Sequence, residues 1–296
     1  MKTSAFKNIK SWLNKANFNR PKNYFNKYTI ISVIVTVFAI IITTYFVRPI
    51  YFEYNEIKKI NFNLKKVFFF TLILGSIFGM ANILQQVSLL YTDIANSAVF
   101  TVLYVVIVPL ISYFIFSIKI HPSIWPSVTL CLIGGLLLSE IKNYDVRFGD
   151  MLVIIGAFFW AFHIIFIYKV LKIFNFPIAI ATFQCLVAGI FCSFPALAFE
   201  TVTINLISKE ITELLYAGIL SSGVAFMLQA YAQRVLSPAS VAIIFSLEGV
   251  FASIFGWILL DQFLSEIKVF GIMIILLAVI FSQLIPIYGK KNYGRI

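Results

Sequence analysis

The chain has 296 residues, of which 61% are hydrophobic, 17% aromatic and only 12% charged. A packed soluble domain is about half apolar and about a quarter charged, so this composition excludes a single soluble core and predicts an all-α, polytopic membrane protein. The formal net charge of +11 comes mostly from the N-terminal tail and the loops. Such placement suits an anionic lipid surface, and we expect no nucleic-acid partner.

The sequence carries no recognisable catalytic or cofactor motif. Cys131, Cys185 and Cys192 lie in apolar stretches without metal or redox spacing, so we expect them to be small core residues. No phosphate-binding glycine loop, nucleophile elbow or metal-ligand cluster occurs. Acids and bases are scattered singly, so we expect neither an enzyme nor a cofactor or metal site.

Residues 1–27 form a basic tail with seven Lys and Arg and no acid. The tail is not expected to be a secretory signal peptide, because no short apolar core with a small-residue cleavage site precedes the first full-length span. A helix needs roughly 20 apolar residues to cross the hydrocarbon core. Nine segments are long enough, at about 28–47, 66–88, 94–116, 122–139, 148–170, 176–198, 209–231, 238–260 and 266–287.

The distribution of Lys and Arg predicts the orientation. After the tail, one set of loops and the C-terminus hold twelve of them and the opposite set holds four. Short basic loops stay on the cytoplasmic side, so a cytoplasmic C-terminus is expected. Nine spans would then place the strongly basic N-terminus outside, which conflicts with the same rule.

An internal repeat is indicated by an offset of 144 residues. Residues 81–116 align with 225–260 without a gap and share seven identical positions. Corresponding spans are five apart in order and therefore cross the membrane in opposite directions, as in the inverted repeats of many secondary transporters. We predict an incomplete first repeat at 28–140, a second repeat at 148–287 and a basic C-terminal tail at 288–296.

The same offset places the span 148–170 against residues 4–26, which belong to the basic tail. The first helix of the first repeat is therefore missing. Restoring it would give ten spans and remove the conflict over orientation. A truncated or degenerate start, a genuine nine-span variant and a tail lying on the membrane are the alternatives, and we favour the first.

Several motifs resemble those of EamA-type transporters, in the drug/metabolite transporter superfamily. They are the Ser97-Ala98 pair and the run 103–110, then Gly149-Asp150-Met151-Leu152 and residues 156–163, and finally Ala230-Tyr231-Ala232-Gln233, Ser237-Pro238-Ala239 and residues 247–251. The resemblance covers about residues 28–287.

The resemblance implies a ten-helix bundle in a bacterial inner membrane. Such a bundle carries a small metabolite, such as an amino acid, a nucleobase or a related compound. Gly249 stands where the family usually has proline, so any kink after Glu248 would depend on the flexibility of glycine.

Trp160 and His163 are the first candidate site residues. They are three residues apart near the middle of a span and share a helix face. An indole and an imidazole side by side could stack on a planar substrate, donate a hydrogen bond and carry a proton. A histidine satisfied within the core is the alternative.

Neutral polar side chains form the second candidate group. Amides and hydroxyls pointing into a bundle can bind a zwitterion without a fixed charge, but they are equally ordinary as interhelical hydrogen bonds, worth about 0.6–2 kcal/mol each. The group is Asn82, Gln85, Gln86, Ser97, Thr101, Tyr104, Gln229 and Ser240.

Glu248 lies halfway along its span, where an ionised carboxylate is expensive unless it is paired or hydrated. It could couple transport to a proton gradient, or hold the bundle together by a hydrogen bond, and we favour the structural role. The sequence thus favours a secondary transporter working by alternating access, with the bilayer and a small molecule as partners. A passive facilitator or exchanger and an inactive truncated relic are the alternatives.

Overall fold

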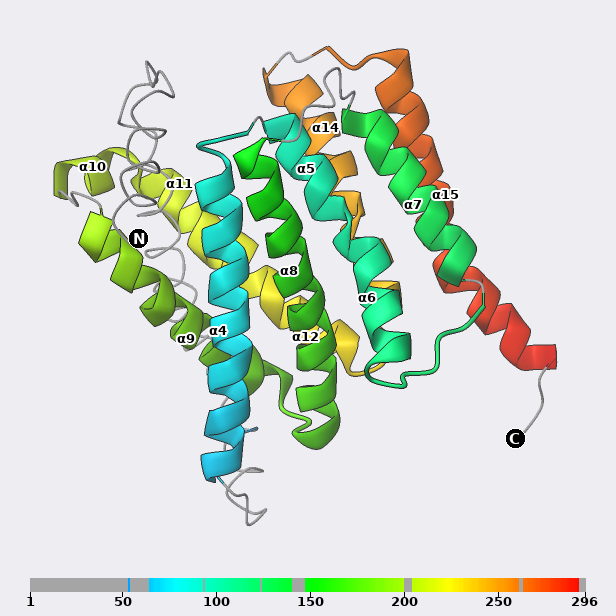
Figure 1. The fold of residues 1–296 in the computed structure, drawn as a ribbon, viewed down its shortest axis with the longest axis horizontal. Coiled ribbons are helices and arrows are strands. Elements are labelled where there is room, and N and C mark those ends of the chain that lie inside the picture. Colours follow the sequence, from blue (N-terminus) through cyan, green and yellow to red (C-terminus); the bar gives the residue numbers. More distant parts are fainter. Residues whose placement is uncertain are drawn as a thin grey trace, which may run out of the picture.

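The computed structural model describes Glu53 and residues 64–92, 94–122, 124–139, 147–199, 204–260 and 263–292, and within them it is helical without strands. Helices are expected there, because in hydrocarbon a backbone must satisfy its own polar groups. The helices are α4 Leu64–Ser88, α5 Ile94–Val102, α6 Tyr104–Phe114, α7 Ile124–Ser139, α8 Phe148–Ile173, α9 Pro177–Phe199, α10 Ile204–Lys209, α11 Ile211–Tyr216, the π-helix η1 Ala217–Val224, α12 Ala225–Gln233, α13 Pro238–Phe245, α14 Leu247–Leu260 and α15 Glu266–Asn292 (Figure 1).

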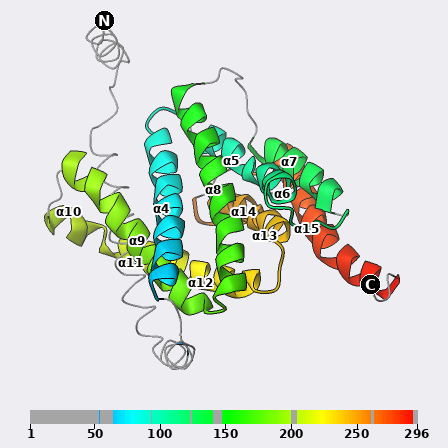
Figure 2. The ribbon, with the colours of Figure 1, turned by 60° about the horizontal axis from the view of Figure 1, so that its bottom comes forward.

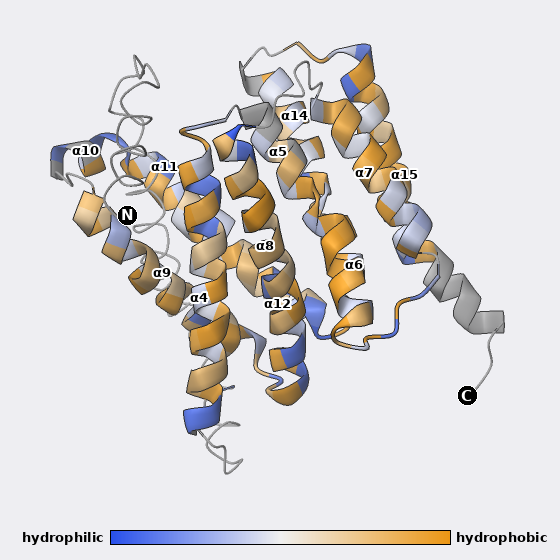
Figure 3. Ribbon diagram, in the orientation of Figure 1, coloured by the Kyte–Doolittle hydropathy of each residue, from blue (hydrophilic) through white to orange (hydrophobic). Residues whose placement is uncertain are grey.

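The helices confirm an all-α membrane bundle. Six segments of the described chain are long and apolar enough to cross a membrane, and two shorter apolar helices cover 100–114 and 124–139. Large apolar side chains such as Phe114, Phe194 and Leu197 are exposed on the outside, where the ribbon is mostly hydrophobic (Figure 3). The predicted span at 28–47 and the basic tail at 1–27 lie outside the described residues.

Two predicted spans are kinked rather than continuous. The segment 94–116 divides into α5 and α6 at Leu103, and 238–260 divides into α13 and α14 at Ser246. The Ser246 hydroxyl donates to the Ile243 carbonyl at 2.6 Å, a back-bond that bends helices. Helix α14 continues through Gly249, so the break in this span precedes Glu248.

The predicted span at 209–231 is also irregular. It consists of α11, η1 and α12, with eight residues in π-helical form between the two α-helices. At the end of η1 the Ala225 N–H donates to the Leu220 carbonyl, five residues earlier. A π-helical segment of this kind is common at functional sites.

Helices α7 and α15 cross at two glycines. A Cβ added to Gly134 would lie 2.9 Å from the Gly271 carbonyl oxygen, and one added to Gly271 would lie 2.7 Å from the Gly134 carbonyl oxygen. Only residues without a side chain permit this backbone approach. Under the 144-residue offset Gly134 corresponds to Ala278, which is fully buried.

Helices related by the offset of 144 residues run in opposite directions (Figures 1 and 2). Helix α7 runs against α15, and α4 runs against α11 to α12. The two kinks also match, because Leu103 plus 144 is position 247 and the second kink lies one residue earlier, at Ser246. Helix α4 begins and α8 ends at the same end of the bundle, which we term the basic face. Its described basic residues are Lys65, Lys66, Lys119, Lys169, Lys172 and Arg234.

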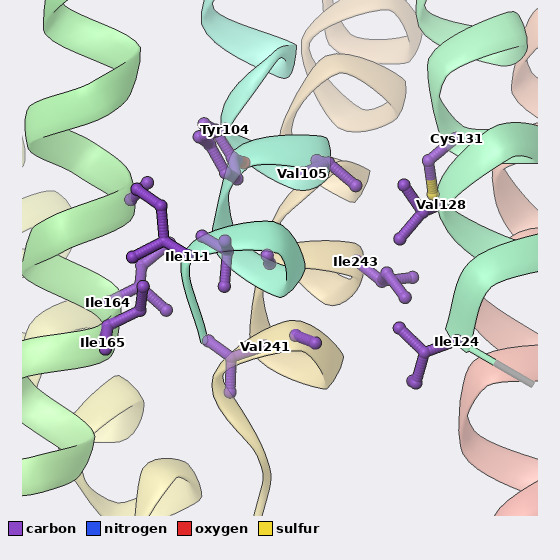
Figure 4. Packing of buried hydrophobic residues seen from close by; sticks show 14 of the residues in the cluster. Tyr104, Val105, Ile111, Ile124, Val128, Cys131, Ile164, Ile165, Val241 and Ile243 are labelled. Carbon is purple, nitrogen blue, oxygen red and sulfur yellow. The ribbon is translucent and has the colours of Figure 1, made fainter. Parts of the chain in front are cut away.

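The largest apolar core lies where α6, α7, α8 and α13 meet (Figure 4). Tyr104 and Val105 of α6, Cys131 of α7, Ile164 of α8 and Ile243 of α13 are all buried in it. All three cysteines are buried, so their prediction as small core residues is confirmed. This core fixes one side of α8 and leaves its other side to α4 and α9.

The crossing of α7 and α15 gives the first testable prediction. We expect G134A to destabilise the protein by about 1–3 kcal/mol, because the new methyl group would meet the Gly271 carbonyl and an Ile275 side-chain carbon 2.6 Å away. G156A is the matched control, since its Cβ would make an ordinary 3.5 Å contact with Leu84. Thermal unfolding in detergent would measure both variants, and equal melting temperatures would contradict the close crossing.

Candidate functional site

Four rings from three helices form a cluster in the middle of the bundle. The imidazole of His163 stacks on Phe78 of α4 at a centroid distance of 4.9 Å. Trp160 lies edge-on to His163 at 6.0 Å and parallel to Phe226 of α12 at 6.4 Å. The shared helix face predicted for Trp160 and His163 thus places their rings side by side.

Close packing of α4 against α9 positions these rings. A Cβ on Gly75 would lie 2.5 Å from the Cβ of Val187, and one on Gly79 would lie 2.9 Å from the ring of Phe191. Helix α4 can therefore approach α9 closely while it also packs along α8. Phe78 lies between the two glycines and faces both neighbours.

Amide side chains hold the two polar rings. The Trp160 Nε1–H donates to Gln85 Oε1 at 2.9 Å. His163 Nε2 lies 3.0 Å from Gln184 Oε1 of α9. An amide oxygen can only accept, so His163 donates from Nε2 and Nδ1 is the acceptor of the neutral ring.

A second amide chain ties α12 to α8. Gln229 Nε2 donates to Gln233 Oε1 at 3.1 Å, and Gln233 Nε2 donates to the Ile164 carbonyl at 2.7 Å. Both glutamines are buried. The Ile164 carbonyl follows His163 directly, so this chain joins the rings in one group. We term it the central cluster: Phe78, Gln85, Trp160, His163, Gln184, Phe226, Gln229 and Gln233.

Three polar atoms of the central cluster are buried without a partner. They are His163 Nδ1, Gln184 Nε2 and Gln229 Oε1, and Gln86 Oε1 on α4 is in the same situation. His163 and Gln184 are completely buried and Gln229 is 3% exposed. Each buried polar atom without a partner costs about 1–3 kcal/mol, so the cluster holds unused hydrogen-bonding capacity. None of its members is an acidic residue, Lys or Arg.

Most other predicted site residues have partners elsewhere. Asn82 Nδ2 donates to the Phe78 carbonyl, and Thr101 donates to the Ser97 carbonyl, each within its own helix. Tyr104 lies in the apolar core of α6, α7 and α13. Ser240 bonds Ser237 in the first turn of α13. These contacts do not bring them into the central cluster.

Glu248 also lies outside the central cluster. It is in the first turn of α14, directly after the kink, and its side chain is exposed. It lies within Coulombic reach of the Tyr104 phenol. Tyr104 and Glu248 are equivalent positions under the offset of 144 residues.

Four members of the cluster were absent from the sequence candidates. Gln184 and Gln233 could have been predicted from the sequence, because an amide within an apolar span must find a partner on another helix. Phe78 and Phe226 could not have been predicted from the sequence, because nothing distinguishes them from the other phenylalanines among the 32 in the chain. Their selection depends on which helix faces meet, and this is a tertiary property.

The amide chain gives the second testable prediction. Q233L should lower the free energy of unfolding by about 1–3 kcal/mol, because it leaves Gln229 Nε2 without its partner and removes the side-chain bond between α12 and the Ile164 carbonyl. Q283L is the matched control, because Gln283 is half-buried and bonds only its neighbour Ser282. Thermal unfolding of the two variants would decide, and equal destabilisation would contradict the assigned role of Gln233.

Residues 147–284 match the EamA-like transporter family. An uncharacterised transporter of Archaeoglobus fulgidus is 32% identical over 200 residues, which cover 68% of this chain and 64% of that protein. The chain therefore spans somewhat less than two thirds of the length of this relative. A protein of known crystal structure superposes with a TM-score of 0.68 over 92% of each chain. Its sequence identity of 11% means that this likeness shows the fold alone.

The matched region begins at the residue before α8 and ends within α15. It therefore contains Trp160, His163, Gln184 and the amide chain of α12. The same region carries motifs by which the sequence resembled this family. Residues 147–284 of this multi-pass membrane protein thus belong to the EamA-like transporter family.

Proposed function

We propose that the protein is a secondary transporter that moves a small metabolite across the membrane by alternating access. Membership of the EamA-like family supports transport rather than catalysis. The sequence has no phosphate-binding loop, so the driving force would be a solute or ion gradient. The central cluster is the proposed substrate site.

The buried polar atoms without partners carry this proposal. In hydrocarbon no water is available to satisfy His163 Nδ1, Gln184 Nε2 and Gln229 Oε1. A purely structural cluster would be expected to satisfy its own polar atoms, as the pairs Trp160 with Gln85 and Gln233 with Ile164 do. A solute that enters the cluster would supply the missing partners.

The chemistry of the cluster favours a flat and uncharged substrate. Its rings offer faces for stacking, and its amides and imidazole offer both donors and acceptors. It contains no Lys, Arg, Asp or Glu that would balance a fixed charge on a ligand. Among amino acids, nucleobases and related compounds, we therefore propose a substrate with a planar heterocyclic ring.

The two oppositely directed halves supply a mechanism. We propose that residues 28–140 and 148–287 are the inverted repeats and rock against each other around the central cluster. The kinks at Leu103 and Ser246 lie at nearly equivalent positions of the two halves and would let the α5–α6 and α13–α14 segments bend. We also propose that the basic face is cytoplasmic, in the plasma membrane of a prokaryotic cell, which places the C-terminus inside.

Solute flux in proteoliposomes tests the proposed function. We expect uptake of at least one planar heterocyclic solute from a panel of nucleobases, aromatic amino acids and aliphatic amino acids. Uptake should fall at least about tenfold in Q184L, because this variant removes the amide that bonds His163 and provides the unused donor. F183L is the matched control, because Phe183 precedes Gln184 on the same helix and its side chain is exposed. Flux limited to aliphatic amino acids, or equal flux in Q184L and F183L, would contradict the proposed site.

Proton coupling is tested on the two protonatable residues. We propose His163 as the proton carrier because it lies within the central cluster, whereas Glu248 lies outside it. H163Q should therefore abolish uptake driven by a pH gradient while leaving exchange of labelled for unlabelled solute. E248Q should retain gradient-driven uptake. Gradient-driven uptake that persists in the double variant would exclude both residues as the proton carrier. Wild-type uptake that does not respond to the pH gradient would favour a passive facilitator or exchanger.

A further inference from the structure

The face opposite the basic face carries a buried and tightly packed contact between the end of α4 and the start of α8. The Thr92 hydroxyl donates to Asp150 Oδ1, and the Arg147 N–H donates to Asp150 Oδ2 at 2.8 Å. A Cβ on Gly149 would lie 2.7 Å from backbone atoms of residues 88–92. Thr92 and Asp150 are 4% and 1% exposed, so opening this contact would strand buried polar groups.

The basic face carries a different contact, made by Glu53. Its carboxylate accepts the Ile178 N–H at 3.3 Å and the Ala179 N–H at 3.1 Å, in the first turn of α9. The first N–H groups of a helix have no acceptor within the helix, so Glu53 satisfies two of them. Because Glu53 precedes α4, this contact joins the first half of the chain to a helix of the second half.

Two further segments meet beside Glu53. Arg234, after α12, donates from Nε to Asn175 Oδ1 at 2.7 Å, in the loop between α8 and α9. Lys172 Nζ donates to the Arg234 carbonyl at 3.4 Å. Both bonds are exposed to solvent. Among the described residues, Arg234 and Tyr231 lie within Coulombic reach of Glu53, and Lys172 bonds the Arg234 carbonyl.

We propose that Glu53, Asn175 and Arg234 form a latch that closes the basic face and opens when solute passes that face. The inference rests on the proposed alternating-access function. The latch joins three segments through a few side chains, and its bond between Arg234 and Asn175 is exposed, so water can replace this bond when the latch opens. Water cannot replace the contact between Thr92 and Asp150, because both residues are buried. At the face opposite the basic face, this contact holds the end of α4 against the start of α8.

The ionisation of Glu53 biases the latch. Burial raises the pKa of Glu53 above its usual value, although the two backbone N–H groups and Arg234 lower it. An open latch would hydrate the carboxyl and return its pKa toward the usual value. The closed latch therefore binds a proton more tightly than the open one. Low pH favours closure, and opening increases as the pH rises through the raised pKa.

Hydrogen exchange tests the latch without any substrate. Protection of the Ile178 and Ala179 amides depends on Glu53, so in the purified full-length protein E53A should exchange both amides at least about tenfold faster. E53Q should keep one of the two amides within about threefold of the wild type and lose the pH dependence, because a neutral amide keeps one acceptor oxygen for one N–H. E213A, which removes an exposed carboxyl of α11, is the matched control.

Labelling of Cys185 tests whether the latch also gates the interior. Cys185 is 1% exposed, contacts Phe78 and Ala188, and lies eight residues or about 12 Å along α9 from its start. A polar, membrane-impermeant thiosulfonate should label it at least about tenfold faster in E53A and R234A than in the wild type. C185S identifies the signal, and exchange in residues 148–152 should stay unchanged because the opposite face remains closed.

Faster exchange in E53A together with faster labelling in E53A and R234A supports the latch. Unchanged exchange at Ile178 and Ala179 in E53A, or unchanged labelling of Cys185 in either variant, overturns it. Neither readout needs a substrate. A failure of the proposed transport function would appear separately, as absent flux in a protein whose latch still responds.

Discussion

The absence of water from the hydrocarbon region is the constraint on which the structure depends. It requires each backbone to form helices and each buried polar side chain to find a partner within the protein. The Gln229, Gln233 and Ile164 chain meets this requirement by joining two helices. The unused acceptor of His163 does not meet it, and this departure is the observation that supports the proposed substrate site.

Glycines at the helix crossings determine which side chains meet in the central cluster. Gly75 and Gly79 let α4 approach α9 closely, while the same helix packs along α8. As a result Phe78 reaches His163, and Gln85 reaches Trp160, although these pairs are far apart in sequence. Stability and site geometry therefore depend on the same helix crossings.

The sequence predicted the features that depend on composition and local spacing. Six long apolar spans, the buried cysteines and the neighbouring rings of Trp160 and His163 follow from hydropathy and helical periodicity. The kink at Ser246 was not predicted. A serine hydroxyl that donates to a carbonyl of its own helix bends that helix only where the surrounding packing allows it. Phe226 was missed because no local pattern tells which of many apolar rings will face the histidine.

The central claim is that the polar atoms around His163 receive a solute in the middle of the bilayer. Fluorescence of Trp160 tests it most directly, in a variant whose other tryptophans, Trp12, Trp125 and Trp257, are replaced by phenylalanine. Because Trp160 lies in the cluster and bonds Gln85, a transported heterocyclic solute should change its emission saturably, and Q184L should weaken the apparent affinity. An emission that stays constant across solute concentrations that saturate flux would contradict the account.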